Sequence, residues 1–285
     1  MKLLTFLYQG KKHAGVLVGA AVAPVEEINA KHGSRIPNDL LEIIRTGVPG
    51  IDPADVATLP LAEVTPQLPY ETPPKIWCIG LNYLSHAEDI NAVQPEEPGS
   101  FMKPASCMFQ PGGNIVLPPK DISDDVDAEG ELGVVIGKTC RFVPAADIGS
   151  VIFGYTTTLD LTALDILRKN PRYLTRSKSI DTFFSFGPVI VTADEVKDPY
   201  NLTLTCTIDR GGKRLFEGSV STSRLHRKLE TLVEYLLRAN NVPAGSVLLT
   251  GTGIIVKEDA ALAPGDTVSI SAPEIGTLTN TAVVV

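Results

Sequence analysis

Residues 124–138 read DDVDAEGELGVVIGK, an acidic half followed by an apolar half. In an extended strand successive side chains point to opposite faces, so every second residue shares a face. Four carboxylates then project the same way, namely Asp125, Asp127, Glu129 and Glu131. Residues 133–136 are apolar and predict that the strand continues into a buried sheet. The stretch therefore predicts a strand that carries acidic side chains toward the protein interior.

Carboxylates on one face of a strand repel each other, and the interior of a sheet offers them little water. A bound cation would relieve that repulsion. Because the stretch contains no His or Cys, its oxygen donors suit Mg²⁺, Mn²⁺ or Ca²⁺ rather than zinc. The alternative is a solvated acidic strand at the edge of a sheet.

Length and composition indicate an ordinary globular protein. The 285 residues suffice for one large domain, or for a large domain with a small one. Hydrophobic residues make up 44% and charged residues 20% of the chain, which is typical of a sizeable core. The net charge of −8 argues against a nucleic-acid partner. No apolar run reaches the roughly 18 residues of a membrane-spanning helix, so no membrane partner is expected.

The cysteines indicate a reducing compartment. Cys78, Cys107, Cys140 and Cys206 are far apart in the sequence and form no CxxC motif. This pattern predicts buried, reduced thiols in a cytoplasmic protein.

The N-terminal region predicts a small β-rich domain over residues 1–70. Residues 2–8 and 15–18 are expected to pair as a hairpin across a turn at residues 9–13. The alternative is a signal peptide, because two lysines precede the apolar run at 14–25. Asn38 is expected to cap a helix over 39–46. A proline-rich passage then places a domain boundary near residue 70, with a second domain over 71–285.

Two residues outside the acidic stretch could complete a metal site. Asp160 ends an alternating strand predicted over 151–161, so it is a candidate third ligand beside Glu129 and Glu131. The alternative is that Asp160 caps a helix over 162–168. Lys178 lies in a basic segment and would balance the charge of three carboxylates around a divalent ion.

His86 is a candidate general base. If residues 84–90 form a helical turn, His86 and Asp89 fall on one face, and an imidazole held by a carboxylate is the usual construction of such a base. The alternative is an ordinary surface histidine. Residues 91–100 are expected to form a mobile loop.

The C-terminal third predicts structure rather than chemistry. Strands are expected over 201–208, 214–218, 247–250, 267–270 and 277–284, and a helix over 225–239. The glycines at 251 and 253 resemble the start of a dinucleotide fingerprint, but the third glycine is missing, which argues against a nucleotide site.

Several motifs, in this order along the chain, resemble those of the fumarylacetoacetate hydrolase family, in its bacterial and fungal domain-containing branch. The resemblance runs from about residue 75 to the end. The motifs are GLNYLSH at 80–86, FMKP at 101–104, VDAEGELGVVIGK at 126–138, GYTTTLD at 154–160, RSKSIDTF at 176–183, LTGTG at 249–253 and PGD at 264–266.

The resemblance implies a mostly β (α+β) fold, in which a small N-terminal β-rich domain is followed by a rolled β-sheet domain. It also implies a homodimer. It implies that Mg²⁺ or Mn²⁺ is bound by Glu129, Glu131 and Asp160. Lys178 would lie beside the metal, and His86 would be the base, oriented by Asp89 or Glu88. The implied substrate contacts are Tyr83, Lys103, Gly251 and Thr252.

The resemblance also implies an activity on small 2-oxo or diketo acids. Family members cleave acylpyruvates, decarboxylate oxaloacetate or isomerise 2-hydroxy-dienoates, and in each case a chelated metal stabilises an enolate. The expected function is hydrolysis of a C–C bond in a β-diketo acid, such as an acylpyruvate, through a metal-bound enolate. The alternatives are decarboxylation of an oxaloacetate-like acid or isomerisation of a 2-hydroxy-diene-dioate. A different class, a binding protein without activity, also stays open.

Overall fold

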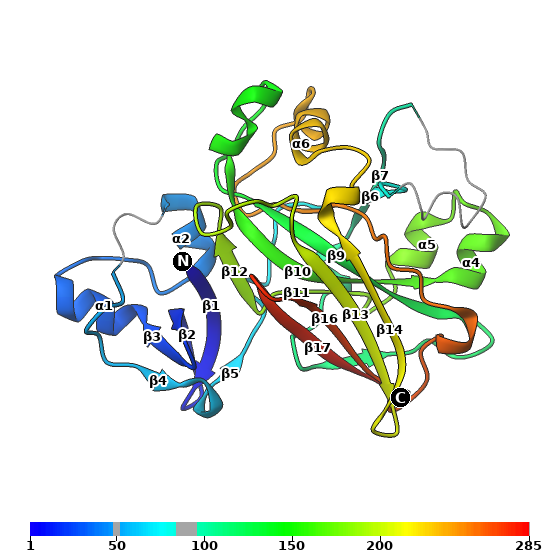
Figure 1. The fold of residues 1–285 in the computed structure, drawn as a ribbon, viewed down its shortest axis with the longest axis horizontal. Coiled ribbons are helices and arrows are strands. Elements are labelled where there is room, and N and C mark those ends of the chain that lie inside the picture. Colours follow the sequence, from blue (N-terminus) through cyan, green and yellow to red (C-terminus); the bar gives the residue numbers. More distant parts are fainter. Residues whose placement is uncertain (48–51, 84–95, 285) are drawn as a thin grey trace.

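The computed structural model describes residues 1–47, 52–83 and 96–284, and this part of the chain is mostly β, as predicted (Figure 1). A 12-stranded sheet and a 5-stranded sheet make up the β structure described. The strands of the larger sheet are β1 (Lys2–Tyr8), β2 (Lys11–Val18), β3 (Ala21–Pro24), β4 (Leu59–Pro60), β5 (Thr65–Pro66), β6 (Ile76–Gly80), β7 (Gly99–Lys103), β9 (Val126–Ile136), β10 (Ile152–Ala163), β11 (Phe184–Phe186), β12 (Val189–Thr192) and β15 (Val247–Leu249). The smaller sheet contains β8 (Asn114–Val116), β13 (Thr203–Arg210), β14 (Lys213–Ser221), β16 (Thr267–Ala272) and β17 (Gly276–Val283). The α-helices described are α1 (Val25–His32), α2 (Leu40–Thr46), α4 (Leu164–Lys169), α5 (Leu174–Lys178) and α6 (Leu229–Leu237).

The acidic strand lies inside the larger sheet. The strand order is β4-β3-β2-β1-β12-β10-β9-β15-β6-β7, with β5 paired to β1 and β11 to β10. β9 is therefore hydrogen-bonded on both sides, to β10 and to β15. The alternative of a solvated edge strand is wrong, because β9 lies between two other strands of the sheet and its Asp127 and Glu131 are buried.

The smaller sheet packs against β9 on the face opposite to its carboxylates. A Cβ atom added to Gly130 would lie 2.8 Å from Cδ1 of Ile270 in β16, so a glycine is needed for this close approach. In Figure 1 the strands of the smaller sheet, β13, β14, β16 and β17, cross in front of β9 and β10. One apolar core fills the space between the sheets and includes Leu132, Val134 and Ile270. Packing on this side directs the odd-numbered side chains of β9 to the other face.

The N-terminal strands extend the larger sheet. β1 and β2 form the predicted hairpin, and β1 also pairs with β12 through Leu3 and Ile190. The turn contains only Gln9 and Gly10, both with positive φ, so the five-residue turn predicted at 9–13 is wrong. A two-residue turn of this handedness matches the twist of the paired strands. The division into domains at residue 70 stays a prediction.

Helix ends differ from the sequence expectations at two places. Asp39, not Asn38, caps α2, because its side chain accepts a 2.9 Å hydrogen bond from the amide of Glu42. The Asn38 side chain instead accepts a hydrogen bond from the backbone of Ala14. The helix predicted over 225–239 is shorter and spans Leu229–Leu237.

Two further findings concern the cysteines and the helices. Cys78, Cys107 and Cys206 are buried free thiols, whereas Cys140 is a half-buried one. Among the residues described, no helix has both the length and the apolar character to cross a membrane.

Candidate metal centre

Strand pairing brings three carboxylates together. In the antiparallel pair of β9 and β10, Asp160 lies opposite Glu129, and Glu131 lies opposite Thr158. One carboxylate oxygen from each of Glu129, Glu131 and Asp160 lies within 4.8 Å of the others. Glu131 and Asp160 are buried, and Glu129 is partly buried.

Asp160 is not a helix cap. β10 continues past it to Ala163, and Ala163 occupies the position before α4. The alternative that Asp160 is an N-cap is therefore wrong. Its side chain instead belongs to the acidic cluster, which consists of Glu129, Glu131 and Asp160. The neighbouring threonines make the burial of this strand possible: the hydroxyls of Thr156 and Thr157 each donate a 2.8 Å hydrogen bond to a backbone carbonyl.

Two lysines neutralise part of the cluster. Nζ of Lys178, at the end of α5, lies 2.7 Å from Oε2 of Glu129 and 3.0 Å from Oδ2 of Asp160. Nζ of Lys103, on β7, donates a 2.5 Å hydrogen bond to Oδ1 of Asp160, and this side chain is 0% exposed. Three carboxylates and two ammonium groups leave one negative charge, which a divalent cation would reverse to one positive charge.

Burial and mutual repulsion shift the pKa values in the cluster. Burial raises the pKa of Glu131 well above its usual range, and the charges of Asp160 and Glu129 raise it further. Burial lowers the pKa of Lys178, but the carboxylates around it outweigh this effect, so its pKa is raised. The cluster therefore holds a cationic Lys178 beside Glu131, whose anionic form burial and the neighbouring charges disfavour.

Each carboxylate is also held by a donor that is not Lys178. The Thr162 hydroxyl donates to Oε1 of Glu129 at 2.5 Å, and the amide of Gly251 donates to Oε2 of Glu131 at 2.6 Å. Lys103 holds Asp160 in the same way. Thr162 is not among the site residues expected from the sequence, because the predicted strand ends at residue 161. The alternation of residues 158, 160 and 162 on one strand face was the available signal.

The predicted substrate contacts lie around the cluster. Tyr83 is fully buried, and its hydroxyl has no hydrogen-bond partner among the residues described. Burial, and then the charge of Glu131, raise the pKa of Tyr83. Thr252 is buried, and its hydroxyl oxygen accepts a 3.1 Å hydrogen bond from the amide of Ile254. Lys103 contacts a carboxylate rather than an open space, and whether any of these residues contacts a substrate stays a prediction.

Asn82 fixes the loops that carry Tyr83 and Gly251. Its side-chain amide donates a 3.0 Å hydrogen bond to the carbonyl of Thr250, and its side-chain oxygen accepts one from the amide of Arg227. A Cβ atom at residue 253 would lie 2.5 Å from the Tyr83 ring, so Gly253 makes room for that ring. Gly253 therefore serves the packing of Tyr83.

The remaining acidic residues of the stretch lie outside the cluster. Asp125 precedes β9 and pairs with Arg168 at 2.8 Å. Asp127 is buried, its Oδ1 has no hydrogen-bond partner among the residues described, and burial followed by the charges of Asp125 and Glu129 raises its pKa to about 7. The predicted base His86 and its partners Glu88 and Asp89 lie outside the described residues.

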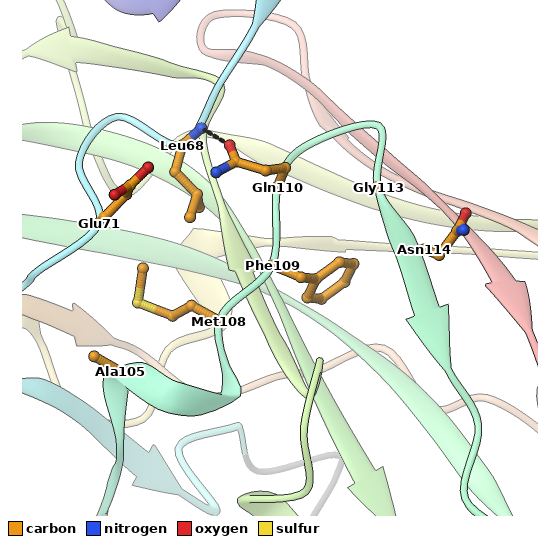
Figure 2. Close-up of a pocket in the computed structure, with 8 residues that line it drawn as sticks. All are labelled: Leu68, Glu71, Ala105, Met108, Phe109, Gln110, Gly113 and Asn114. Carbon is orange, nitrogen blue, oxygen red and sulfur yellow. Dashed lines mark hydrogen bonds between the residues drawn. The ribbon is translucent and has the colours of Figure 1, made fainter. Parts of the chain in front are cut away.

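A separate cavity of about 480 Å³ lies where the segment before β6 meets the segment between β7 and β8 (Figure 2). Leu68, Met108 and Phe109 line it, and Oε1 of Gln110 accepts a 2.6 Å hydrogen bond from the amide of Leu68. No residue of the acidic cluster is among those that line this cavity. We therefore assign this cavity no part in the chemistry of the cluster.

The residues of the cluster fit a hard divalent cation. Their donors are carboxylate oxygens only, which suit Mg²⁺ or Mn²⁺. A cation at this place would offset the burial and repulsion that disfavour the charged form of Glu131. Fold and site define a two-sheet β protein whose larger sheet carries an internal carboxylate cluster.

Comparison with known proteins agrees with this class. The family model described as fumarylacetoacetate (FAA) hydrolase C-terminal matches residues 75–283. The human mitochondrial oxaloacetate tautomerase FAHD2A is 36% identical over 235 residues, which are 81% of this chain and 73% of that protein. The chain therefore belongs to the fumarylacetoacetate hydrolase family, whose members are enzymes.

Two solved structures show the same fold. The fumarylacetoacetate hydrolase from Exiguobacterium antarcticum has a TM-score of 0.83 at 28% identity, and the match covers 100% of both chains. The maleylpyruvate hydrolase from Sphingobium sp. SYK-6, in complex with manganese(II) and pyruvate, has a TM-score of 0.77 at 28% identity. That match covers 100% of this chain and 99% of the hydrolase.

Proposed function

We propose that the protein is a divalent-metal-dependent enzyme that acts on a small 2-oxo or diketo acid. The observation that carries this proposal is the convergence of Glu129, Glu131 and Asp160 beside Lys178. The relative that binds manganese(II) together with pyruvate supports both the ion and the class of substrate. Mg²⁺ and Mn²⁺ are the proposed ions.

The cluster would hold the ion, and other residues would hold the substrate. A divalent ion at the three carboxylates would supply Lewis-acid stabilisation of negative charge on the oxygens of a 2-oxo acid. Lys178 keeps its positive charge beside the cluster and would attract the carboxylate of the substrate. The Tyr83 hydroxyl is a buried donor that could hydrogen-bond to an oxygen of the substrate. The amide of Gly251 donates a hydrogen bond to Glu131, and the Asn82 side chain donates one to the carbonyl of Thr250. These two hydrogen bonds hold the loop after β15 beside the cluster.

The proposed reaction is hydrolysis of a C–C bond in a β-diketo acid, which releases pyruvate from an acylpyruvate. It needs a base that removes a proton from water, and His86 is proposed for this role with Asp89 or Glu88 as its partner. A His86→Ala variant is expected to lose hydrolysis by at least about 100-fold, the usual contribution of a general base. A wild-type rate in this variant would remove His86 from the mechanism.

Enol–keto tautomerisation of oxaloacetate is the second candidate. Its support is the 36% identity to the human tautomerase over 81% of this chain. Tautomerisation moves a proton between oxygen and carbon and needs no water, so one assay for each reaction distinguishes the two.

The cytoplasmic location and the homodimer stay predictions.

A panel assay tests the proposal. Chelator-treated protein is supplied with Mg²⁺ or Mn²⁺ and assayed with acylpyruvates for pyruvate release and with enol-oxaloacetate for loss of ultraviolet absorbance. Metal-dependent turnover in the first assay supports hydrolysis, and turnover in the second alone supports tautomerisation. No turnover of any 2-oxo acid would contradict the proposal.

A further inference from the structure

All four side-chain oxygens of Glu129 and Asp160 already accept a hydrogen bond. Thr162 and Lys178 donate to Oε1 and Oε2 of Glu129, at 2.5 and 2.7 Å. Lys103 and Lys178 donate to Oδ1 and Oδ2 of Asp160, at 2.5 and 3.0 Å. A divalent ion held by these two carboxylates therefore competes with at least one of the three donors.

Lys178 is the donor best able to move. Thr162 is 0% exposed on a strand that is paired with β9 at this residue. The Lys103 side chain is also 0% exposed, and its Nζ has a second acceptor in the carbonyl of Leu161, at 3.4 Å. Lys178 instead ends the short helix α5 and carries its charge on a flexible four-carbon stem. Because its ammonium group contacts both carboxylates, an ion between them repels it from both.

The ring of Phe101 lies beside the Lys178 ammonium group. Nζ of Lys178 is 5.4 Å from the centre of this ring, within the roughly 6 Å over which a ring face attracts a cation. Phe101 and Lys103 are alternate residues of β7 and therefore share one face of that strand, the face from which Lys103 reaches Asp160. The Lys178 side chain is only 6% exposed, so water weakens the attraction little.

We propose that Phe101 is a positioning residue that receives the ammonium group of Lys178 when a divalent ion occupies the cluster. This inference rests on the proposed metal-dependent function. Lys178 then serves the site in two places: against Glu129 and Asp160 as in the structure, and against the Phe101 ring once the ion takes their oxygens. In both places a positive charge stays beside the cluster, where an anionic substrate would bind.

Two substitutions separate attraction from packing. Phe101→Leu removes the ring and keeps an apolar side chain. Pentafluorophenylalanine, incorporated at position 101 alone, keeps the size and shape of the ring but reverses the charge of its face, on which the attraction depends. It also keeps the inference testable if the leucine variant does not fold. Met102→Leu is the control, because Met102 is the next residue on β7 and is 47% exposed.

The first measurement follows the position of Lys178 in chelator-treated full-length protein labelled with ¹³C-lysine. Nuclear Overhauser contacts are recorded between the ε-methylene protons of Lys178 and the ring protons of Phe101, and the Lys178 signal is assigned by its loss in Lys178→Arg. Addition of MgCl₂ is expected to strengthen these contacts, because the ammonium group moves toward the ring.

The second measurement is the affinity for Mg²⁺, obtained by displacement of bound Mn²⁺ and followed by electron paramagnetic resonance. The affinity should fall by about 3- to 30-fold in Phe101→Leu and in the pentafluorophenylalanine protein, the range that a cation–ring attraction supplies. Met102→Leu should match wild type.

The outcomes separate the inference from the function on which it rests. Overhauser contacts that weaken or stay unchanged while Mg²⁺ binds would overturn the proposed movement of Lys178. Wild-type affinity for Mg²⁺ in the pentafluorophenylalanine protein would overturn it as well and make Phe101 a packing residue. If folded wild type bound neither Mn²⁺ nor Mg²⁺, the proposed function itself would fail, and the inference with it.

Discussion

Nζ of Lys178 lies 3.0 Å from Oδ2 of Asp160, and both side chains are almost fully buried. The pair joins a short helix to a strand interior, and the same ammonium group contacts Glu129. Breaking a buried pair by removing one partner leaves an uncompensated charge, which typically costs about 3–5 kcal/mol.

Lys178→Met should therefore destabilise the protein by about that amount when no divalent ion is present. Addition of Mg²⁺ should recover part of the loss, because the ion replaces the missing positive charge. Denaturant unfolding with and without Mg²⁺ measures both effects. Lys138→Met is the control, because Lys138 is exposed, and it should change stability by less than about 0.5 kcal/mol. Equal stability of Lys178→Met and wild type in chelator would contradict this account of the cluster.

Glu131→Gln should abolish activity and leave the fold intact. The substitution removes one of three like charges from a buried cluster, and the side-chain oxygen of glutamine can still accept from the amide of Gly251. Relief of repulsion should keep the free energy of unfolding in chelator at or above that of wild type. Circular dichroism with urea unfolding, together with the turnover assay, tests this. Retained metal-dependent turnover would remove Glu131 from the set of ligands.

Tyr83→Phe should lower activity without lowering stability. The hydroxyl is buried and has no hydrogen-bond partner among the residues described, so its removal should be neutral or stabilising. If the hydroxyl donates to a charged substrate, kcat/KM should fall by about 10- to 100-fold, since such a bond contributes about 1.5–3 kcal/mol. Wild-type kinetics with raised stability would assign the hydroxyl no role in binding.

The four thiols should differ in their reactivity. Burial is the main cause that raises the pKa of Cys107 to about 11 and that of Cys206 to about 12. A raised pKa lowers the thiolate fraction at pH 8, and the thiolate is the reactive form. Cys140 is half-buried and should be alkylated first by iodoacetamide, with the others reacting only after unfolding. Mass spectrometry of the folded protein at pH 8 checks this order, and equally fast labelling of Cys107 would contradict it.

Gly154 should not tolerate a side chain. A Cβ atom there would lie 2.1 Å from the carbonyl oxygen of Val191, so the backbone of β10 or β12 would have to shift. Gly154→Ala should destabilise the protein by about 1–3 kcal/mol or more. Gly149→Ala is the control, since nothing lies within 4 Å of the added atom, and should change stability by less than about 0.5 kcal/mol. Equal urea midpoints for the two variants would contradict the packing described for β10.

Local patterns predicted the chemistry-bearing strands well, for a physical reason. Glu129 and Glu131 share a face because strand side chains alternate, and this depends on nothing beyond the strand itself. The N-terminal hairpin is local in the same sense. Its turn was placed wrongly because Lys11 and Lys12 look like turn residues but extend the exposed end of β2.

Contacts between residues far apart in the sequence were harder to predict. Nothing in the sequence around Lys103 indicates that its ammonium group is buried on Asp160, 57 residues later. The predicted strand ends at residue 161, whereas β10 continues through Thr162, because its end is set by pairing with β9, where Thr162 lies opposite Asp127. The central position of β9 likewise follows from the order of the strands, which a local pattern does not specify.

The central claim is that Glu129, Glu131 and Asp160 form a site for one divalent ion. Equilibrium binding of Mn²⁺ to chelator-treated protein, followed by electron paramagnetic resonance, tests it most directly. Wild type should bind one Mn²⁺ per chain, and pyruvate should change the spectrum of the bound ion. Glu131→Gln should lose that binding while keeping its fold. Absence of bound Mn²⁺ in folded wild type, or undiminished binding in Glu131→Gln, would contradict the claim.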